Sequence, residues 1–185
     1  MSAPRVLVPL AEGFEELEAI SVIDLLRRAG VEVVTAGLAD GPVRASRGTR
    51  LLPDTTLETV ADRAWDMIVL PGGLPGADHL AADARLRDLL LEHAGAGRWT
   101  AAICAAPKVL AAHGLLEGRR ATAYPGVLEA AGHGDAVAEA VVRDGELITS
   151  RGPGTAMDFA LALIEVLVDR AKRDEVEGAL QRPAA

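Results

Sequence analysis

Short apolar runs of strand length alternate along the chain with stretches of helical periodicity. The first unit is an apolar run at residues 5–10, a helical pattern at 15–29 that stops at Gly30, and a second apolar run at 31–36. This order is typical of a strand, a helix and a second, parallel strand. The later predicted strands are 43–46, 49–53, 66–70, 99–103 and 120–123, and the predicted helices between them are 84–94, 105–112 and 126–131.

The last part of the chain predicts a hairpin over 137–150 that turns at Asp144-Gly145, followed by a long helix over 155–172. The polar segment 173–185 predicts a loosely docked tail. Because strands and helices alternate, we expect an α/β fold whose mostly parallel sheet is covered by helices on both faces. The length of 185 residues fits a single domain spanning 1–185.

Functional groups in open sheets of this kind gather at the carboxyl ends of the strands. Three segments follow predicted strands in this way, at residues 11–18, 71–76 and 104–107. The sequence therefore predicts that these three segments meet and form the functional site.

Composition and charge restrict the possible partners. A net charge of −8 argues against nucleic acid, because nucleic-acid binding depends on Lys and Arg that displace counterions. The apolar run at 6–10 is too short for a signal-peptide core, and the run at 159–168 carries Glu165, so we expect no membrane segment. Since Cys104 is the only cysteine, an internal disulfide and a zinc-binding cysteine cluster are excluded, which fits a reducing cytoplasm.

Cys104 follows the apolar stretch Ala101–Ile103 and precedes a helical pattern rich in alanine. Small neighbours suit a sharp turn from strand to helix, where the backbone doubles back closely. At such a turn the helix dipole and free N–H groups would lower the thiol pKa from its usual ~8.5 and make the sulfur nucleophilic and easily oxidised. The alternative interpretation is a small buried side chain with no chemical role.

Glu18 belongs to an acidic group at the start of the first predicted helix. Leu17, Ile20 and Leu25 are expected to form the buried stripe of that helix, so that Glu18, next to Leu17, leans toward the sheet edge. A carboxyl group that touches a thiolate cannot be ionised as well, so Glu18 and Cys104 would share a proton and titrate together. The alternative is ordinary capping of a helix N-terminus by acidic residues.

The glycine-rich run at 71–76 lacks the spacings of dinucleotide-binding and P-loop motifs. We expect it to act through its backbone: the amide of Gly73, together with that of Ala105, would form an oxyanion hole. The alternative is a tight exit from a strand.

The four histidines show no metal-ligand spacing, and we expect neither a metal nor another cofactor. A Cys-His-Glu amidotransferase would need a His-x-Glu motif after Cys104, and none occurs, which disfavours that family.

Four motifs together resemble the ThiJ/PfpI superfamily, and within it the parkinsonism-associated deglycase branch. The resemblance covers residues 5 to about 168 and depends on EGFEELE at 12–18, LPGG at 70–73, AAICAAP at 101–107 and TSRGPGT at 149–155. It implies a flavodoxin-like three-layer sandwich, a homodimer, and an oxidisable cysteine that accepts a hydrogen bond from a protonated glutamic acid. In this chain those two roles fall on Cys104 and Glu18.

Further positions match the family less closely. The resemblance places Arg28 and Arg47 at or beside the site and Arg151 near a dimer interface, although each arginine is also explained as a solvated surface residue. Where close relatives place a histidine before a proline, this chain has Tyr124. Tyrosine ordinarily ionises near pH ~10 and cannot replace a histidine base at neutral pH, which puts the full catalytic set in doubt.

The resemblance implies three functions. The first is the cofactor-independent conversion of methylglyoxal or glyoxal to a hydroxy acid, or the related removal of early glycation adducts, in which Cys104 attacks an aldehyde. The second is a non-enzymatic redox sensor or chaperone in which Cys104 is oxidised. The third is an intracellular cysteine peptidase, which ranks last because no histidine base is assured.

Overall fold

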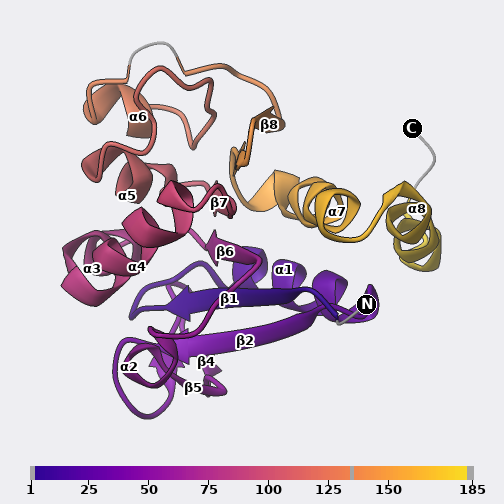
Figure 1. The fold of residues 1–185 in the computed structure, drawn as a ribbon, viewed down its shortest axis with the longest axis horizontal. Helices are drawn as coiled ribbons and strands as arrows, with labels where there is room; N and C mark the ends of the chain where they lie inside the picture. The colour runs from indigo at the N-terminus through magenta and orange to yellow at the C-terminus, as the bar shows by residue number, and fades with distance from the viewer. Residues whose placement is uncertain (1–2, 134–135, 183–185) are drawn as a thin grey trace.

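The computed structural model describes residues 3–133 and 136–182. Within these ranges a seven-stranded sheet has the order β5-β2-β1-β6-β7-β9-β8 (Figure 1). All its neighbours run parallel except β8, which pairs antiparallel with β9. The strands of this sheet are β1 (Arg5–Leu10), β2 (Glu32–Gly37), β5 (Thr55–Thr56), β6 (Met67–Leu70), β7 (Trp99–Ile103), β8 (Val141–Asp144) and β9 (Leu147–Ser150), and β3 (Val43–Arg44) with β4 (Arg50–Leu51) forms a separate hairpin.

Helices cover both faces of the sheet, which confirms the α/β flavodoxin-like sandwich. One apolar cluster joins β1 side chains such as Val6 and Val8 to Val22 and Phe159, and a second joins Leu7 to helices on the opposite face. Because successive strand side chains point to opposite faces, both faces of a central parallel strand must be apolar. The helices are α1 (Glu16–Arg28), α2 (Leu57–Val60), α3 (Gly76–Ala82), α4 (Ala84–Gly95), α5 (Pro107–Ala112), α6 (Val127–Ala130), the 3-10 turn η1 (Pro153–Thr155), α7 (Ala156–Leu167) and α8 (Arg170–Ala179).

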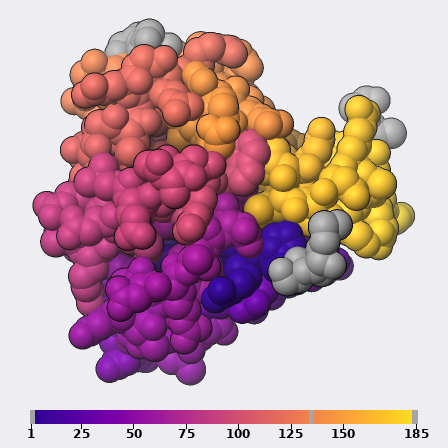
Figure 2. Space-filling model, in the orientation of Figure 1, coloured from indigo at the N-terminus to yellow at the C-terminus, as the bar shows by residue number. Residues whose placement is uncertain are grey.

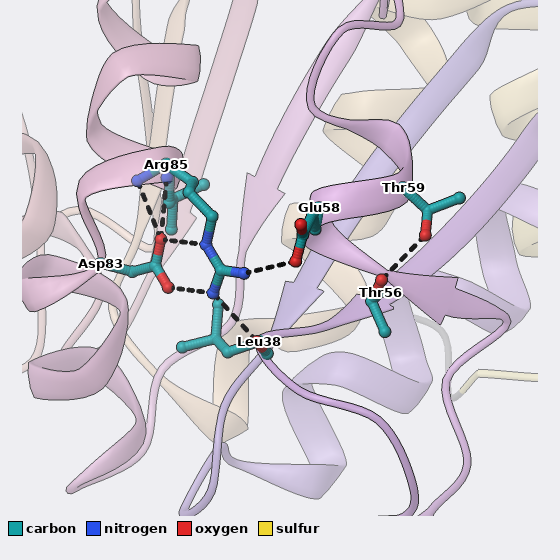
Figure 3. Close-up of polar contacts among 7 residues, drawn as sticks. Leu38, Thr56, Glu58, Thr59, Asp83 and Arg85 are labelled. Carbon is teal, nitrogen blue, oxygen red and sulfur yellow. Dashed lines mark hydrogen bonds and ion pairs between the residues drawn. The ribbon is translucent and has the colours of Figure 1, made fainter.

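Arg85, in the first turn of α4, links three elements at one edge of the sheet (Figure 3). Its guanidinium donates to Asp83 at 2.6 Å and to the carbonyl oxygen of Leu38 at 2.9 Å, and lies 3.8 Å from Glu58 of α2. The Asp83 carboxylate also caps α4 by accepting the N–H groups of Arg85 and Leu86. These contacts hold the end of β2 against α2 and α4.

The predicted helix over 155–172 is wrong, because the structure has two helices there. Asp169 has an extended backbone, and its carboxylate accepts the N–H of Lys172 at 2.7 Å, so it ends one helix and caps α8. Residues 173–179 belong to α8, where Val176 is buried, and Arg182 forms an ion pair with Asp158 of α7 at 2.7 Å. Residues 173–179 are therefore helical and Arg182 contacts α7, whereas how firmly the segment is docked stays a prediction, and 183–185 lie outside the described residues.

Figure 2 shows this C-terminal region, in yellow, standing out on one side of the molecule. In the part of the chain that the structure describes, no helix combines the length and the apolar character needed to cross a membrane.

The predicted strand at 120–123 is also wrong. Residues 121–123 are buried but belong to no strand, and the N–H of Thr122 donates to the hydroxyl of Thr149 at 2.9 Å instead of to a strand carbonyl. The hydroxyl of Thr149 accepts the hydrogen bond that a carbonyl of a neighbouring strand would accept in a sheet. The hydrophobic periodicity of the sequence does not indicate such a side-chain partner. The helix predicted from 105 begins instead at Pro107, because Cys104 to Ala106 form the turn that leads into it.

Candidate active site

Cys104 lies at the turn directly after β7, in a left-handed backbone conformation with φ 61°. Such a φ is costly for a residue with a side chain and persists only where the surroundings hold it. Here the N–H of Cys104 donates to the carbonyl oxygen of Ser150 at 2.9 Å, and its own carbonyl accepts the N–H of Tyr124 at 2.9 Å. The flanking Ala105 and Ala106 are buried and small, as the sharp turn predicted from the sequence requires.

Glu18, in the first turn of α1, is fully buried and lies against Cys104. The N–H of Gly72 donates to its Oε2 at 2.8 Å, whereas Oε1 has no partner of ordinary hydrogen-bond geometry among the described residues. The side chain of Cys104 is a close polar neighbour, because both side chains stand against Gly72 and each changes the pKa of the other. The sequence prediction that these two side chains meet agrees with this geometry.

Glu18 is buried for a different reason than the one predicted from the apolar stripe of its helix. Leu17 and Ile20 are 51% and 44% exposed, so they do not form the buried stripe of α1. The buried face contains Glu18 itself, together with Val22 and Leu25 at helical spacing. Glu18 is thus a carboxyl group placed in a core position.

Gly72 is the residue that lets the two side chains approach. A Cβ atom at this position would lie 2.6 Å from the Cβ of Cys104 and 2.7 Å from Oε2 of Glu18. Both distances are shorter than any ordinary contact, and Gly72 is buried with no room to move aside. The glycine run is visible in the sequence, but this steric role was missed, because a glycine doublet after a buried strand only hints at it.

The electrostatics of the pair follow from its burial. Burial raises the pKa of Glu18 from 4.5 to about 7, and the nearby charge of Glu15 acts in the same direction. Burial, followed by the charge and hydrogen bond of Glu18, raises the pKa of Cys104 to about 12. The N–H groups of Ala105 and Gly73 lower the pKa of Cys104 but are outweighed.

The lowered thiol pKa expected from the sequence is therefore wrong while Glu18 is ionised. Two buried anions in contact repel each other, so the pair holds one proton between them. When Glu18 carries that proton, the charge that raises the pKa of Cys104 is gone and the carboxyl hydroxyl can donate to sulfur. The pair as a whole gives up its first proton near pH 7, because burial raises the pKa of Glu18 to about 7.

A pocket of about 300 Å³ opens over Cys104. Besides Gly73 and Ala105, its lining consists of Glu15, Ser46, Arg47, Leu74, Tyr124, Val127 and Pro153. Arg47 and Tyr124 line the same pocket as Cys104, as the sequence predicted, whereas Leu74, Val127 and Pro153 carry no chemical signal and were missed. No histidine is among the lining residues described for this pocket.

Two of the suggested arginines lie elsewhere. Arg28 is at the opposite end of α1 from Glu18, is half-exposed, and pairs with Asp24 at 2.7 Å. Arg151 lines a separate recess of about 80 Å³ that it shares with Tyr124 and Glu129. Within one chain Arg28 does not line this pocket, because the helix axis carries it away from the strand ends, and its place at the site stays a prediction.

Comparison with known proteins adds to this geometry. The model of the DJ-1/PfpI family matches residues 4–166. Protein dj-1beta of Drosophila melanogaster is 46% identical over 173 residues, which is 92% of each chain. The glutathione-independent glyoxalase DJR-1.2 of Caenorhabditis elegans is 38% identical over 164 residues, or 88% of this chain and 87% of that one. The solved structure of oxidized Toxoplasma gondii DJ-1 matches with a TM-score of 0.94 and 40% identity, covering 98% of this chain and all of that chain.

Proposed function

The chain belongs to the DJ-1/PfpI family, and from that premise we propose that it is a cofactor-independent enzyme that uses Cys104 to convert small reactive aldehydes, such as methylglyoxal or glyoxal, into hydroxy acids. The observation that carries the proposal is the buried carboxyl group of Glu18, which stands beside Cys104 at Gly72 and has a pKa raised to about 7. A group that exchanges its proton near neutral pH is suited to general acid and base catalysis.

The first step forms a carbon–sulfur bond. The thiolate of Cys104 attacks the aldehyde carbon, the carbonyl π electrons move to oxygen, and the proton held by Glu18 passes to that oxygen to give a hemithioacetal. The N–H groups of Gly73 and Ala105, which approach the sulfur, stabilise the negative charge as it develops.

The second step moves hydrogen between two carbons. Glu18, now ionised, removes the proton from the former aldehyde carbon and returns a proton to the neighbouring carbon, while the hydroxyl proton passes between the two oxygens. The result is a thioester of the hydroxy acid. Water then displaces the sulfur as thiolate and releases the lactate anion from methylglyoxal; one of the two protons set free returns to Glu18 and the other passes to solvent. Removal of early glycation adducts would begin with the same attack.

Two observations support this choice of chemistry. The Caenorhabditis elegans relative bears the name of a glutathione-independent glyoxalase, a reaction of this class. The pocket of about 300 Å³ over the sulfur suits a small substrate. Tyr124 stands where close relatives place a histidine, and a missing acid or base typically lowers the rate by ~10²–10⁴-fold, so we expect slow turnover.

The test is lactate formation from methylglyoxal by wild type, Cys104→Ala and Glu18→Ala. We expect both substitutions to abolish turnover, because one removes the nucleophile and the other removes the proton carrier. Arg28→Ala is the matched control, since Arg28 lies at the far end of the same helix as Glu18. Equal rates in all four proteins would reject the proposal.

A redox sensor or chaperone is the second candidate, favoured by the partly exposed sulfur and by the oxidized state of the Toxoplasma gondii structure. Two molecules of peroxide would convert the thiol to a sulfinic acid and release two molecules of water. A stable mass gain of two oxygens on Cys104, without aldehyde turnover, would choose this function. Proteolysis ranks third, because no histidine lines the described pocket.

We also propose that the chain forms a homodimer and works in the cytosol. Leu17 and Ile20 expose apolar surface on α1. The neighbouring Glu16 accepts the N–H groups of Arg47 and Thr49, which fixes the 47–49 turn beside this surface. A second copy of the chain would bury this surface. We expect Leu17→Arg to convert a dimer to a monomer in analytical ultracentrifugation, and a wild type that sediments as a monomer would refute the dimer. The lone thiol fits a reducing compartment.

A further inference from the structure

Two hydroxyl groups link the backbone of Cys104 to the wall of its pocket. Ser150 is the last residue of β9 and is fully buried, and its carbonyl oxygen accepts the N–H of Cys104. Its hydroxyl lies 2.7 Å from the carbonyl oxygen of Ala140 and 2.7 Å from the hydroxyl of Thr155. Thr155 in turn lies 3.2 Å from the N–H of Gly152.

The number of hydroxyl protons decides which group donates and which accepts in each of these hydrogen bonds. The carbonyl of Ala140 can only accept, so the single hydroxyl proton of Ser150 is used there. The hydroxyl of Thr155 must then donate to Ser150, which leaves its lone pairs free to accept the N–H of Gly152. The alternative contact, from Thr155 to the carbonyl of Gly152 at 3.0 Å, would leave one of the two 2.7 Å contacts without a proton.

Gly152 faces the sulfur. A Cβ atom built on Gly152 would lie 3.9 Å from the Sγ of Cys104 and 3.4 Å from the ring of Tyr124. The next residue, Pro153, lines the pocket directly. Gly152 and Pro153, here termed the pocket wall, therefore stand close to the space that a substrate on the sulfur would occupy.

We propose that Ser150 and Thr155 are positioning residues that hold the pocket wall against Cys104 and thereby restrict the site to small aldehydes. Neither hydroxyl touches the sulfur; both act through the backbone of Gly152. Because Ser150 also binds the N–H of Cys104, one buried residue fixes both the nucleophile and the wall that faces it. This inference rests on the proposed function only in taking Cys104 as the group that attacks the substrate.

The relative rate at which Cys104 reacts with a bulky and a small reagent tests this role without requiring turnover. N-phenylmaleimide is the bulky reagent and iodoacetamide the small one. Thr155→Val keeps the shape of the side chain but removes both hydrogen bonds, so the wall should open and the ratio of bulky to small reactivity should rise about tenfold. Thr155→Ser retains the hydroxyl and should keep the ratio of wild type.

Thr100→Val is the matched control. Thr100 is a buried threonine on β7, the strand that leads to Cys104, and its hydroxyl has no hydrogen-bond partner among the described residues. Its loss should leave the reactivity ratio unchanged. Gly152→Ala tests the wall from the opposite direction, because its methyl group would sit 3.9 Å from the sulfur and should slow the bulky reagent more than the small one.

The expected pattern is a raised ratio in Thr155→Val, a lowered ratio in Gly152→Ala, and the ratio of wild type in Thr155→Ser and Thr100→Val. A folded Thr155→Val with the ratio of wild type would overturn the proposal, as would a Thr155→Ser as altered as Thr155→Val. If Thr155→Val does not fold, an unchanged ratio in Gly152→Ala would overturn it. In an active protein, the ratio of kcat/KM for phenylglyoxal to that for methylglyoxal should change among the variants in the same way as the reagent ratio. If no lactate forms, the proposed function is refuted, but the reagent test of the pocket wall still applies.

Discussion

Replacing Glu18 with glutamine should remove a pH dependence of stability that the buried carboxyl group creates. Glutamine has nearly the same shape and can still accept the N–H of Gly72, but it carries no titrating proton. The pKa of Glu18 rises from 4.5 in an open chain to about 7 in the folded protein. Each unit of pKa shift corresponds to about 1.4 kcal/mol, so burial of Glu18 in its ionised form lowers the free energy of unfolding by about 3 kcal/mol.

The sign follows from where the proton is held. Between pH 4.5 and about 7 the folded protein keeps the proton on Glu18 while the unfolded chain has released it. The unfolded state then binds fewer protons, so the free energy of unfolding falls as the pH rises through this window. Below pH 4.5 Glu18 is protonated in both the folded and the unfolded state, so its ionisation costs no stability. Above pH 7 Glu18 is ionised in both states, and the full free-energy cost of burying its charge lowers the stability of the folded protein.

Urea unfolding of wild type and Glu18→Gln, followed by circular dichroism, measures this effect. Contributions from groups that do not interact with Glu18 cancel in the difference between the two proteins. Because the pKa of Cys104 depends on Glu18, the comparison stays below the ordinary thiol pKa of 9.0. We expect the variant to gain about 3 kcal/mol relative to wild type between a pH near 4.5 and a pH above 7. A difference that does not change with pH, or that is larger at the acid end, would refute the assignment of a raised pKa to Glu18.

Three further outcomes are expected. The kcat/KM for methylglyoxal should rise with pH through about 7, as the Cys104–Glu18 pair loses its first proton, and a profile that is flat there would contradict the shared proton. Gly72→Ala should lower the melting temperature and abolish turnover, because its Cβ would lie 2.6 Å from that of Cys104, and a stable, active variant would show that the packing is looser than described. Asp169→Ala should cost ~1 kcal/mol in urea unfolding through loss of the cap on α8, whereas an unchanged midpoint would mean that tertiary contacts alone hold this helix.

The features that the sequence predicted correctly are those set by residues close together in the chain or by the general geometry of parallel sheets. The strand 99–103 has the predicted bounds because a short apolar run in an alternating chain has few other possibilities. The turn at Cys104 was predicted from its small neighbours, and the meeting of the segments around Glu18, Gly72 and Cys104 follows from the rule that parallel strands end at one edge.

The features that it missed depend on contacts between distant residues. The apolar segment 121–123 is buried like a strand, but the N–H of Thr122 is bonded to the side chain of Thr149, and no local pattern distinguishes that partner from a strand carbonyl. The break at Asp169 could have been found, since aspartate is a strong helix cap, but the apolar residues before it favoured one continuous helix. The exposure of Leu17 and Ile20 contradicts an amphipathic stripe drawn by hydrophobicity alone, because the buried position belongs to a carboxyl group.

The placement of Glu18 in the core explains why one cysteine can be chemically useful at neutral pH. Alone in water, a glutamic acid with a pKa of 4.5 is ionised at neutral pH and a thiol with a pKa of 9.0 is protonated, so neither exchanges protons readily there. The fold brings the two together through Gly72, and burial delays the first ionisation of the pair to about pH 7, between the two ordinary values. Since two anions cannot share the site, the single remaining proton can lie on either partner, which provides a nucleophile and an acid from the same pair. If this face of α1 were exposed to water, Glu18 and Cys104 would return to their ordinary pKa values. The site would then lose both the nucleophile and the acid at neutral pH.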